Sequence, residues 1–289
     1  MVGKVKIREH KRRLIQVICG LLYNCNFIGF AKGNIFQGKV KGVCVPGLNC
    51  YSCPGAAFAC PLGSLQSALV SAKYRFNYYI VGILLLFGVI FGRVVCGFLC
   101  PFGFIQELLY KIPTKKVKKG TWSQVLSYFK YIILIIFVIV IPLVMAVPGF
   151  CKYICPAGTL EGGIFLVALN EQLRSLIGTL FSWKVGVMLA IMLSAVFVFR
   201  SFCRFLCPLG AIYSLFHKVS ICGVEVNENK CIGCNICVRE CKLDVAEVGD
   251  RECVHCGDCI GHCPTCAISY KNPADRGRND YGKEEFKKN

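Results

Sequence analysis

The sequence has few of the residues and motifs on which most redox cofactors depend. It has four histidines in 289 residues, at positions 10, 217, 255 and 262. All four lie outside the long apolar runs, which excludes a bis-histidine haem within a bilayer. There is no Cys-x-x-Cys-His run for c-type haem, no Gly-x-Gly-x-x-Gly after a predicted strand and no Thr-Gly-Ala-Thr type flavin-attachment site. We therefore expect no haem, flavin or nicotinamide cofactor, and no acid-base or nucleophile constellation indicates a self-contained enzyme.

Acidic residues are also scarce, with 16 Asp and Glu against 34 Lys and Arg and a formal net charge of +18. So basic a chain could bind nucleic acid. Many of its lysines and arginines adjoin apolar runs, however, where membrane topology and anionic lipid headgroups explain them. We expect contact with membrane lipid and no nucleic-acid partner.

Apolar sequence is abundant, since 55% of the residues are hydrophobic and the mean hydropathy is +0.56. A bilayer core needs about 20 residues of helix. Four windows are predicted to be membrane helices: Leu14 to Ala31, Asn77 to Gly92, Trp122 to Val147 and Ser175 to Phe199. The first follows a basic segment, as a signal peptide would, but no small-residue cleavage pattern follows it, which favours a retained helix.

The distribution of lysine and arginine predicts the orientation. With four spans, one side of the membrane receives the N-terminal segment, the connection from Arg93 to Lys119 and the tail after Arg200. This side is richer in basic residues than the other. By the positive-inside rule, we expect a multi-pass protein of the cell membrane with both termini in the cytoplasm.

Cysteine spacing predicts the chemistry of the tail. Two of its runs have the spacing Cys-x2-Cys-x2-Cys-x3-Cys, in which three cysteines bind one [4Fe-4S] cluster and the fourth binds the neighbouring cluster. Zinc is the alternative, because Cys-x2-Cys pairs also build zinc sites. Lys242 stands where the ferredoxin pattern has proline. The predicted ligands are Cys231, Cys234, Cys237 and Cys263 for cluster A, and Cys241, Cys253, Cys256 and Cys259 for cluster B.

A second pattern recurs through the apolar part of the chain. Cys-Pro-x-Gly units begin at Cys60, Cys100, Cys155 and Cys207, each on or near the end of an apolar run. The likeness extends downstream, because the third residue after each glycine is Gln66, Gln106, Glu161 or Tyr213. We interpret this as an internal duplication of two halves, each with two spans, arranged as parallel repeats about an axis normal to the membrane.

The duplication groups the membrane cysteines into two sites. The inner site, on the cytoplasmic side, is predicted to hold a third [4Fe-4S] cluster on Cys96, Cys100, Cys203 and Cys207. The outer site is predicted to hold a fourth cluster on Cys53, Cys60, Cys151 and Cys155, with Cys50 as an alternative ligand and a disulfide as an alternative to the cluster.

The local structure of these motifs follows from their residue types. Cysteines at i and i+4 are expected on one helical face, and the proline either ends that helix or opens the next. Short helices from Gly103 and Gly210 should begin beside the cluster and direct free amides at it. Glu107 and Glu161 are interpreted as helix-start residues. Five cysteines without a motif are interpreted as ordinary apolar residues: Cys19, Cys25, Cys44, Cys222 and Cys266.

The predicted fold is mainly α. A four-helix polytopic membrane domain consists of two parallel pseudo-repeats, residues 1–120 and 121–218, with short re-entrant or interfacial helices. A small α+β ferredoxin-like domain with two clusters follows over residues 219–271, and a polar tail over residues 272–289.

At these motifs the chain resembles the membrane polyferredoxins of the NapH and NosR type. The resemblance covers about residues 10 to 270, and the pairs Cys96/Cys100 and Cys203/Cys207 match the motif pair of that family. It implies a membrane protein of an anaerobic prokaryote that moves electrons to or from redox enzymes outside the cytoplasm. The additional units at Cys60 and Cys155 depart from NapH and suggest the outer cluster.

We therefore expect a transmembrane electron conduit. Electrons from a cytoplasmic ferredoxin, flavodoxin or reductase would enter at the tail, pass the inner and outer clusters, and leave to an extracytoplasmic redox acceptor. Relays are needed because the hydrocarbon core is about 30 Å thick. Two alternatives stay open: a quinol-dehydrogenase-type subunit that exchanges electrons with membrane quinone, and a non-catalytic iron-sulfur membrane anchor or redox sensor.

Overall fold

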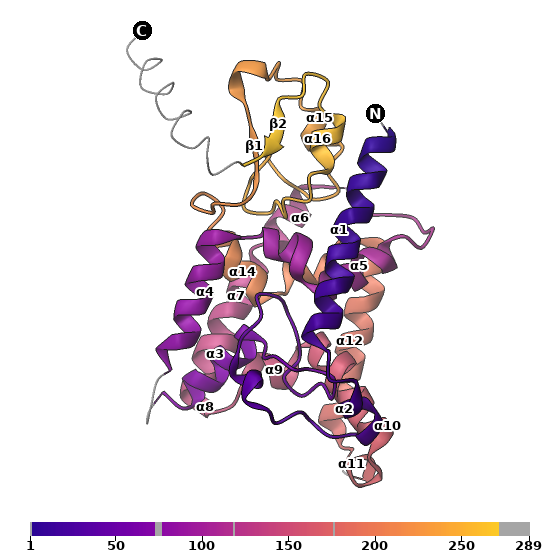
Figure 1. Ribbon diagram of the computed structural model, residues 1–289, viewed down its shortest axis with the longest axis vertical. Helices are drawn as coiled ribbons and strands as arrows, with labels where there is room; N and C mark the ends of the chain where they lie inside the picture. Colours follow the sequence, from indigo (N-terminus) through magenta and orange to yellow (C-terminus); the bar gives the residue numbers. More distant parts are fainter. Residues whose placement is uncertain (1, 73–76, 118, 176, 272–289) are drawn as a thin grey trace.

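The computed structural model describes residues 2–72, 77–117, 119–175 and 177–271. They form a mainly helical body with a smaller unit at one end, which we call the tail unit (Figure 1). The predicted polar tail, residues 272–289, lies outside the described residues.

The first half of the body begins with a long helix that runs from the side of the tail unit toward the opposite end (Figure 1). This helix packs against the π-turn η2 and helix α5. The elements of this half are α1 (Val2–Tyr23), α2 (Phe27–Lys32), η1 (Lys39–Gly42), α3 (Pro61–Val70), α4 (Tyr78–Ile90), η2 (Val95–Leu99) and α5 (Pro101–Tyr110).

The prediction of one helix from Leu14 to Ala31 is wrong. Helix α1 starts in the basic segment and ends at Tyr23, before the chain turns into α2. The physical reason lies in Asn24, whose side-chain amide donates to the Gly20 carbonyl (3.1 Å) and to Asn49 Oδ1 (3.0 Å). Asparagine competes in this way with the helical hydrogen-bond pattern, so α1 ends at Tyr23 and the short helix α2 follows separately.

The second half of the body contains two described helices that are long and apolar enough to cross a membrane, Trp122–Met145 and Thr179–Phe197. Their mean hydropathies are 2.6 and 1.9, and they lie within the third and fourth predicted windows. The elements of this half are α6 (Thr121–Leu126), α7 (Phe129–Ile133), the π-helical η3 (Leu134–Val140), α8 (Ile141–Met145), α9 (Gly149–Tyr153), the π-helical η4 (Gly158–Gly163), α10 (Ile164–Leu169), α11 (Glu171–Ser175), α12 (Thr179–Phe197), α13 (Ser201–Phe205) and α14 (Pro208–Leu215).

The tail unit combines short helices with a two-stranded antiparallel sheet in which Val224 lies opposite Tyr270. The chain enters it after α14 and passes the C-terminal end of α4, where the amides of Ile221 and Cys222 donate to the carbonyls of Val89 and Ile90 (2.9 and 2.8 Å). Its elements are β1 (Val224–Val226), η5 (Glu228–Lys230), α15 (Ile236–Arg239), α16 (Asp258–His262) and β2 (Ile268–Tyr270).

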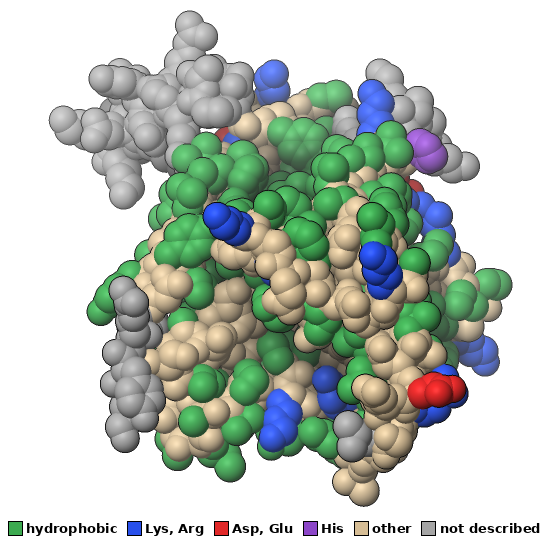
Figure 2. Space-filling view, turned by 60° about the horizontal axis from the view of Figure 1, so that its bottom comes forward, with side chains coloured by type: hydrophobic (Ala, Val, Ile, Leu, Met, Phe, Trp, Pro, Cys, Tyr) green, Lys and Arg blue, Asp and Glu red, His purple; other side chains and the backbone are tan. Residues whose placement is uncertain are grey.

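The body has a cysteine-rich interior and an apolar exterior. Six cysteines of the Cys-Pro motifs belong to the same buried cluster as Phe102, Phe150 and Phe202. Hydrophobic side chains are also spread over the outer face in Figure 2, where few acidic side chains are visible. Extensive exposed apolar surface of this kind marks a membrane or protein interface.

Candidate metal centres

The four Cys-Pro-x-Gly units share one local structure. In three of them the cysteine is the N-cap of a helix and has extended backbone angles, while the proline is the first helical residue, as in α3, α5 and α14. At the fourth unit, helix likewise resumes at Pro156. Proline favours this position because it has no N–H to leave unbonded there.

The expectation that the i and i+4 cysteines share a helical face is wrong. Cys96 lies in η2 and Cys203 lies in α13, whereas Cys100 and Cys207 are the N-caps of the next helices. Each pair therefore straddles a break in the helix. The break directs both sulfurs toward the interior and leaves the first-turn amides of the new helix free.

These free amides point back at the cysteine sulfurs. The N–H of Gly210 donates to Cys207 Sγ, and the N–H of Gly158 donates to Cys155 Sγ, each at 3.4 Å. Helix N-termini carry partial positive charge and suit anionic groups. Thiolates of an iron-sulfur cluster are such groups, so the local structure fits the predicted ligand role.

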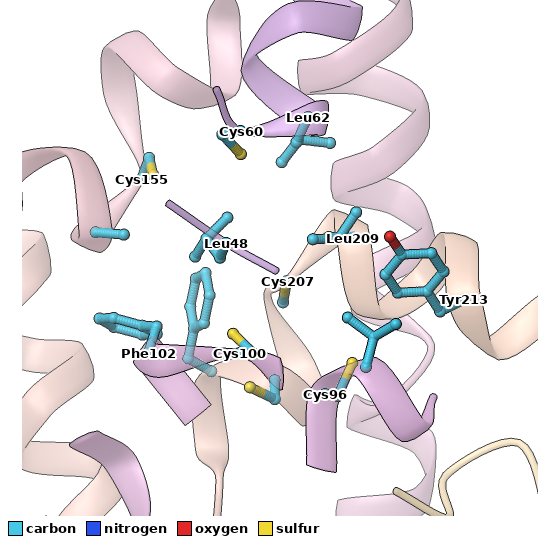
Figure 3. Close-up of a cluster of buried hydrophobic side chains, with 14 of the residues drawn as sticks. Leu48, Cys60, Leu62, Cys96, Cys100, Phe102, Cys155, Cys207, Leu209 and Tyr213 are labelled. Atoms are coloured by element: carbon cyan, nitrogen blue, oxygen red, sulfur yellow. The ribbon is translucent and has the colours of Figure 1, made fainter. Parts of the chain in front are cut away.

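The inner site brings together sulfurs from both halves of the body. Its four cysteines, at positions 96, 100, 203 and 207, are all buried, and the Cys207 thiol lies within electrostatic range of the other three. Figure 3 shows three of them converging below Leu48. Gln106 connects the halves, since its Nε2 donates to Cys203 Sγ (3.1 Å) and its Oε1 accepts from the Phe202 amide (3.1 Å).

The outer site repeats this arrangement at Gln66. Its Nε2 donates to Cys151 Sγ (3.2 Å) and its Oε1 accepts from the Phe150 amide (3.0 Å). Gln66 therefore contacts the Phe-Cys pair of the second half as Gln106 does at the inner site. This correspondence supports the interpretation of the sequence as a duplication.

The structure groups Cys50 with the other outer cysteines. A Cβ atom built on Gly158 would lie 3.7 Å from both Cys155 Sγ and Cys50 Sγ, so these two sulfurs flank one point. Cys155 lies within electrostatic range of Cys50, Cys60 and Cys151. The Cys53 thiol is also buried, faces the backbone amides of Gly55 and Ala56, and lies within electrostatic range of Cys50. Cys50, the predicted alternative ligand, therefore forms a group of four with Cys60, Cys151 and Cys155.

Glu161 and Tyr213 stand where the other two repeat units have glutamine, and both contact a distant segment of the chain. Glu161, in η4, accepts a hydrogen bond from the amide of Cys50 (2.8 Å), as Gln66 does from Phe150. The Tyr213 hydroxyl donates to the carbonyl of Pro46 (2.9 Å). The segment from residue 46 to residue 50 is therefore held by side chains of the second half.

Buried charges beside the inner site were not predicted. Glu107 was interpreted as a helix-start residue, but it lies inside α5 and binds Arg12 through two hydrogen bonds of 2.7 Å. Arg200 also binds it, at 2.8 Å through Nε, and donates to the Cys96 carbonyl. Two guanidinium groups and one carboxylate leave net positive charge here, which suits an anionic cluster.

The tail unit is docked on the body beside the inner site. Glu252 pairs with Arg93 (2.9 Å) and with Lys130 (2.5 Å), the charged residue inside the Trp122–Met145 helix. Asp244 pairs with Arg204. Gly97 lies against this interface, because a Cβ there would come within 2.3 Å of the Val254 carbonyl oxygen.

The cysteines of the tail unit fall into two environments. Cys241, Cys253, Cys256 and Cys259, the predicted cluster B ligands, line one internal pocket together with Cys237. The other cluster A cysteines are more exposed: Cys231 and Cys234 are exposed and Cys263 is half-buried. Burial raises the pKa of Cys259 to about 12, so nearby positive charge such as iron is needed to form its thiolate.

The spacing of the ligands distinguishes a cluster from a single metal ion. Among the described residues, no three His, Cys, Asp or Glu side chains converge closely enough to hold one metal ion. A cubane binds each thiolate at a different iron, so its four sulfurs are spaced more widely than the ligands of a single zinc. All 22 cysteines are free thiols in the structure.

The cysteines without a motif differ in exposure, and one of them, Cys266, donates its amide to the carbonyl of Cys263 (3.4 Å). Cys25 and Cys266 are exposed, and Cys19 and Cys222 are half-buried. Cys44 is buried and contacts Ser64 Oγ at 3.5 Å.

Comparison with known proteins agrees with this chemistry. The model of a 4Fe-4S binding domain matches three segments, residues 76–120, 129–174 and 179–221. An uncharacterized protein of Methanocaldococcus jannaschii is 31% identical over 173 residues, which cover 57% of this chain and 57% of the relative. The regulatory protein NosR of Pseudomonas aeruginosa is 27% identical over 53% of this chain and 21% of NosR. The methylamine utilization ferredoxin-type protein MauN of Methylobacillus flagellatus is 27% identical over 62% of this chain and 58% of MauN.

Each of these three matches spans less than two thirds of the relative's own length. No solved structure gives a significant match.

Proposed function

Because this chain belongs to the iron-sulfur electron-transport proteins that carry the 4Fe-4S binding domain, as its resemblance to NosR-type polyferredoxins predicted, we propose that it relays electrons across a membrane. The relay consists of four [4Fe-4S] clusters, in the order A, B, inner site and outer site. The observation that carries this proposal is the pair of four-cysteine sites within one apolar helical body, one next to the tail unit and one farther from it.

The proposal includes four membrane-crossing segments, formed by α1, α4, the helix from Trp122 to Met145 and α12. The last two are long enough to cross alone. The apolar half of α1 exposes Leu14, Ile18 and Leu22, and α4 exposes Leu86. Side chains of this kind would face lipid. We place the protein in the cell membrane of an anaerobic prokaryote, with both termini in the cytoplasm.

The ligand assignment follows the grouping of the sulfurs. The inner cluster would be held as the sequence predicts, by Cys96, Cys100, Cys203 and Cys207. The outer cluster would be held by Cys50, Cys60, Cys151 and Cys155, with Cys50 in place of Cys53. Clusters A and B keep their predicted ligands. Each cluster supplies a one-electron carrier, and the protein supplies the donors that orient and tune it.

The contact between the tail unit and the body supports this order of transfer. Cluster B ligands lie on both sides of Val254, whose carbonyl oxygen lies against Gly97 in η2. The cluster A cysteines are more exposed and would meet the electron donor, a cytoplasmic ferredoxin, flavodoxin or reductase. An extracytoplasmic redox partner would then accept electrons at the outer site.

Vectorial electron transfer in proteoliposomes tests this function. The full chain is reconstituted anaerobically, oxidised cytochrome c is enclosed in the vesicles, and membrane-impermeant dithionite is added outside. We expect the enclosed cytochrome to be reduced, and Cys155→Ser to stop this reduction while Cys25→Ser leaves it unchanged. Equal rates in wild type, Cys155→Ser and protein-free vesicles would contradict the relay.

One observation favours the quinone alternative as a second candidate. An apolar pocket of about 450 Å³ lies between α7, η3 and α12, and its lining includes Ile154 and Leu206. These residues directly precede Cys155 and Cys207, so a quinone in the pocket would lie near both membrane sites. Quinol-dependent reduction of the tail clusters, slowed by Ile154→Trp, would support this candidate.

A further inference from the structure

A buried segment without regular secondary structure separates the two membrane sites. Residues 45–50 belong to no helix or strand, yet Leu48 is 2% exposed and Asn49 is fully buried. Buried irregular backbone is costly unless its polar groups find partners. Figure 3 shows Leu48 between Cys60 and Cys155 on one side and Cys100 and Cys207 on the other.

Specific contacts fix the position of this segment. The Val45 amide donates to the carbonyl of Ala59, the residue before Cys60 (3.1 Å). The side chain of Asn49 accepts a hydrogen bond from Asn24 (3.0 Å) and donates one to the Phe58 carbonyl (3.5 Å). On the other side, the Tyr213 hydroxyl holds the Pro46 carbonyl. Elements from both halves thus hold the segment between the sites.

The approach to the inner site depends on glycine. A Cβ atom on Gly47 would lie 3.0 Å from the Leu99 carbonyl oxygen and 3.2 Å from Cys100 Cα. A larger residue would therefore push the segment away from Cys100. Close backbone approach is a recurrent reason for glycine at such a position.

Successive amides of the segment face different sites. The amide of Leu48 faces the Cys100 thiol of the inner site, and the amide of Asn49 faces the Cys60 thiol of the outer site. The next residue, Cys50, itself belongs to the outer group. Three consecutive residues therefore connect the two sets of sulfurs through one peptide chain.

We infer that residues 46–50 form the electron-transfer bridge between the inner and outer clusters, with Leu48 and Asn49 as positioning residues whose amides meet one ligand of each. This inference rests on the proposed relay. In the step itself, the inner cluster loses one electron and the outer cluster gains it. No covalent bond forms or breaks. The bridge connects the two sites through covalent bonds and hydrogen bonds. Without it, only packed side chains would lie between the sites.

Gly47→Ala tests the bridge, with Gly42→Ala as the matched control, because a Cβ on Gly42 meets no atom within 4 Å. The anaerobically purified full chain is reduced rapidly at the tail, and freeze-quench EPR follows the arrival of electrons at the outer cluster. We expect Gly47→Ala to retain its iron but to slow this step several-fold, and Gly42→Ala to match wild type.

Two more variants keep the test valid if Gly47→Ala fails to fold. Tyr213→Phe removes only the hydroxyl that holds Pro46, and it should also slow the step. Leu48→Pro deletes the amide that faces Cys100, and it should lower the reduction potential of the inner cluster, because N–H donors to sulfur stabilise the reduced state.

The outcomes separate the bridge from the relay. Full iron content with wild-type transfer rates in Gly47→Ala and Tyr213→Phe would overturn the bridge and leave the relay standing. Loss of the two membrane clusters from the wild-type protein would overturn the relay itself.

Discussion

The inner and outer sites share a construction but differ in their surroundings. Both use Cys-Pro turns and a glutamine that donates to a cysteine of the second half. The inner site is flanked by buried ion pairs and covered by the tail unit. The outer site has Glu161 on a backbone amide and Lys41 over the Tyr51 ring, with Lys41 Nζ lacking a hydrogen-bond partner among the described residues.

The duplicated motif therefore forms the cysteine site in both places, whereas the charges around it distinguish one site from the other. Net positive charge at the inner site would stabilise a reduced, more negative cluster there. The ion pairs also hold together three parts of the chain: the two halves of the body and the tail unit. We therefore expect the inner site to depend on its charges for stability and the outer site to depend on them little.

Glu107→Gln should have the largest effect. It leaves Arg12 and Arg200 buried without their carboxylate, and breaking a buried ion pair costs about 3–5 kcal/mol. The matched substitution at the outer site, Glu161→Gln, breaks no described ion pair and should cost less than about 1 kcal/mol. Thermal unfolding in detergent measures both. Equal losses in the two variants would contradict the contrast between the sites.

Glu252→Gln should come next. It removes the carboxylate that joins the tail unit to Arg93 and Lys130, so the tail should dock more loosely on the inner site. We expect electron transfer from cluster B to the inner cluster to slow several-fold, with iron content unchanged. Glu240→Gln, at an exposed position of the same unit, is the control. Stopped-flow reduction measures the step, and identical rates in the two variants would exclude this docking role.

Gln106→Leu and Gln66→Leu should have smaller and site-specific effects. Each removes one N–H donor to a cysteine sulfur, at the inner and outer site respectively. The potential of that cluster should fall on the order of tens of millivolts, from a hydrogen bond worth about 1 kcal/mol. EPR-monitored redox titration checks this. If Gln106→Leu changed the potential of the outer cluster, or Gln66→Leu that of the inner cluster, our assignment of the glutamines would be wrong.

Lys242→Pro should have the smallest effect. It restores the proline of the ferredoxin pattern and removes half-exposed contacts to Glu9 and Asp258 (3.7 and 3.6 Å). Exposed pairs contribute about 0–1 kcal/mol. We expect wild-type iron content and a change in thermal stability within that range. Loss of clusters A and B would show that Lys242 is essential to the local turn.

The local structure of the Cys-Pro units was predictable because it depends on neighbouring residues alone. The spacing of the Cys-Pro-x-Gly units predicted the grouping of residues 96, 100, 203 and 207, and proline at the first helical position followed from its missing N–H. The choice between Cys50 and Cys53 was not predictable. Both lie in one irregular loop, whose register depends on contacts with Glu161 and the second half of the body.

The buried charged residues were not predicted, because a charged residue in a sequence is ordinarily assigned to the protein surface. One signal was present, since Arg93 and Arg200 each stand three residues before the first cysteine of their pair. Such a repeated arginine indicates a role in the repeat itself and not in membrane topology. The end of α1 at Tyr23 was also missed, because its cause is a long-range bond between Asn24 and Asn49.

The iron content of the anaerobically purified full chain tests the central claim most directly. Four cubane clusters predict about sixteen irons per chain. Cys100→Ser and Cys155→Ser should each lower this number by about four, at the inner and outer site respectively. About eight irons in the wild type, unchanged by either substitution, would show that only the tail unit binds clusters and would contradict the relay.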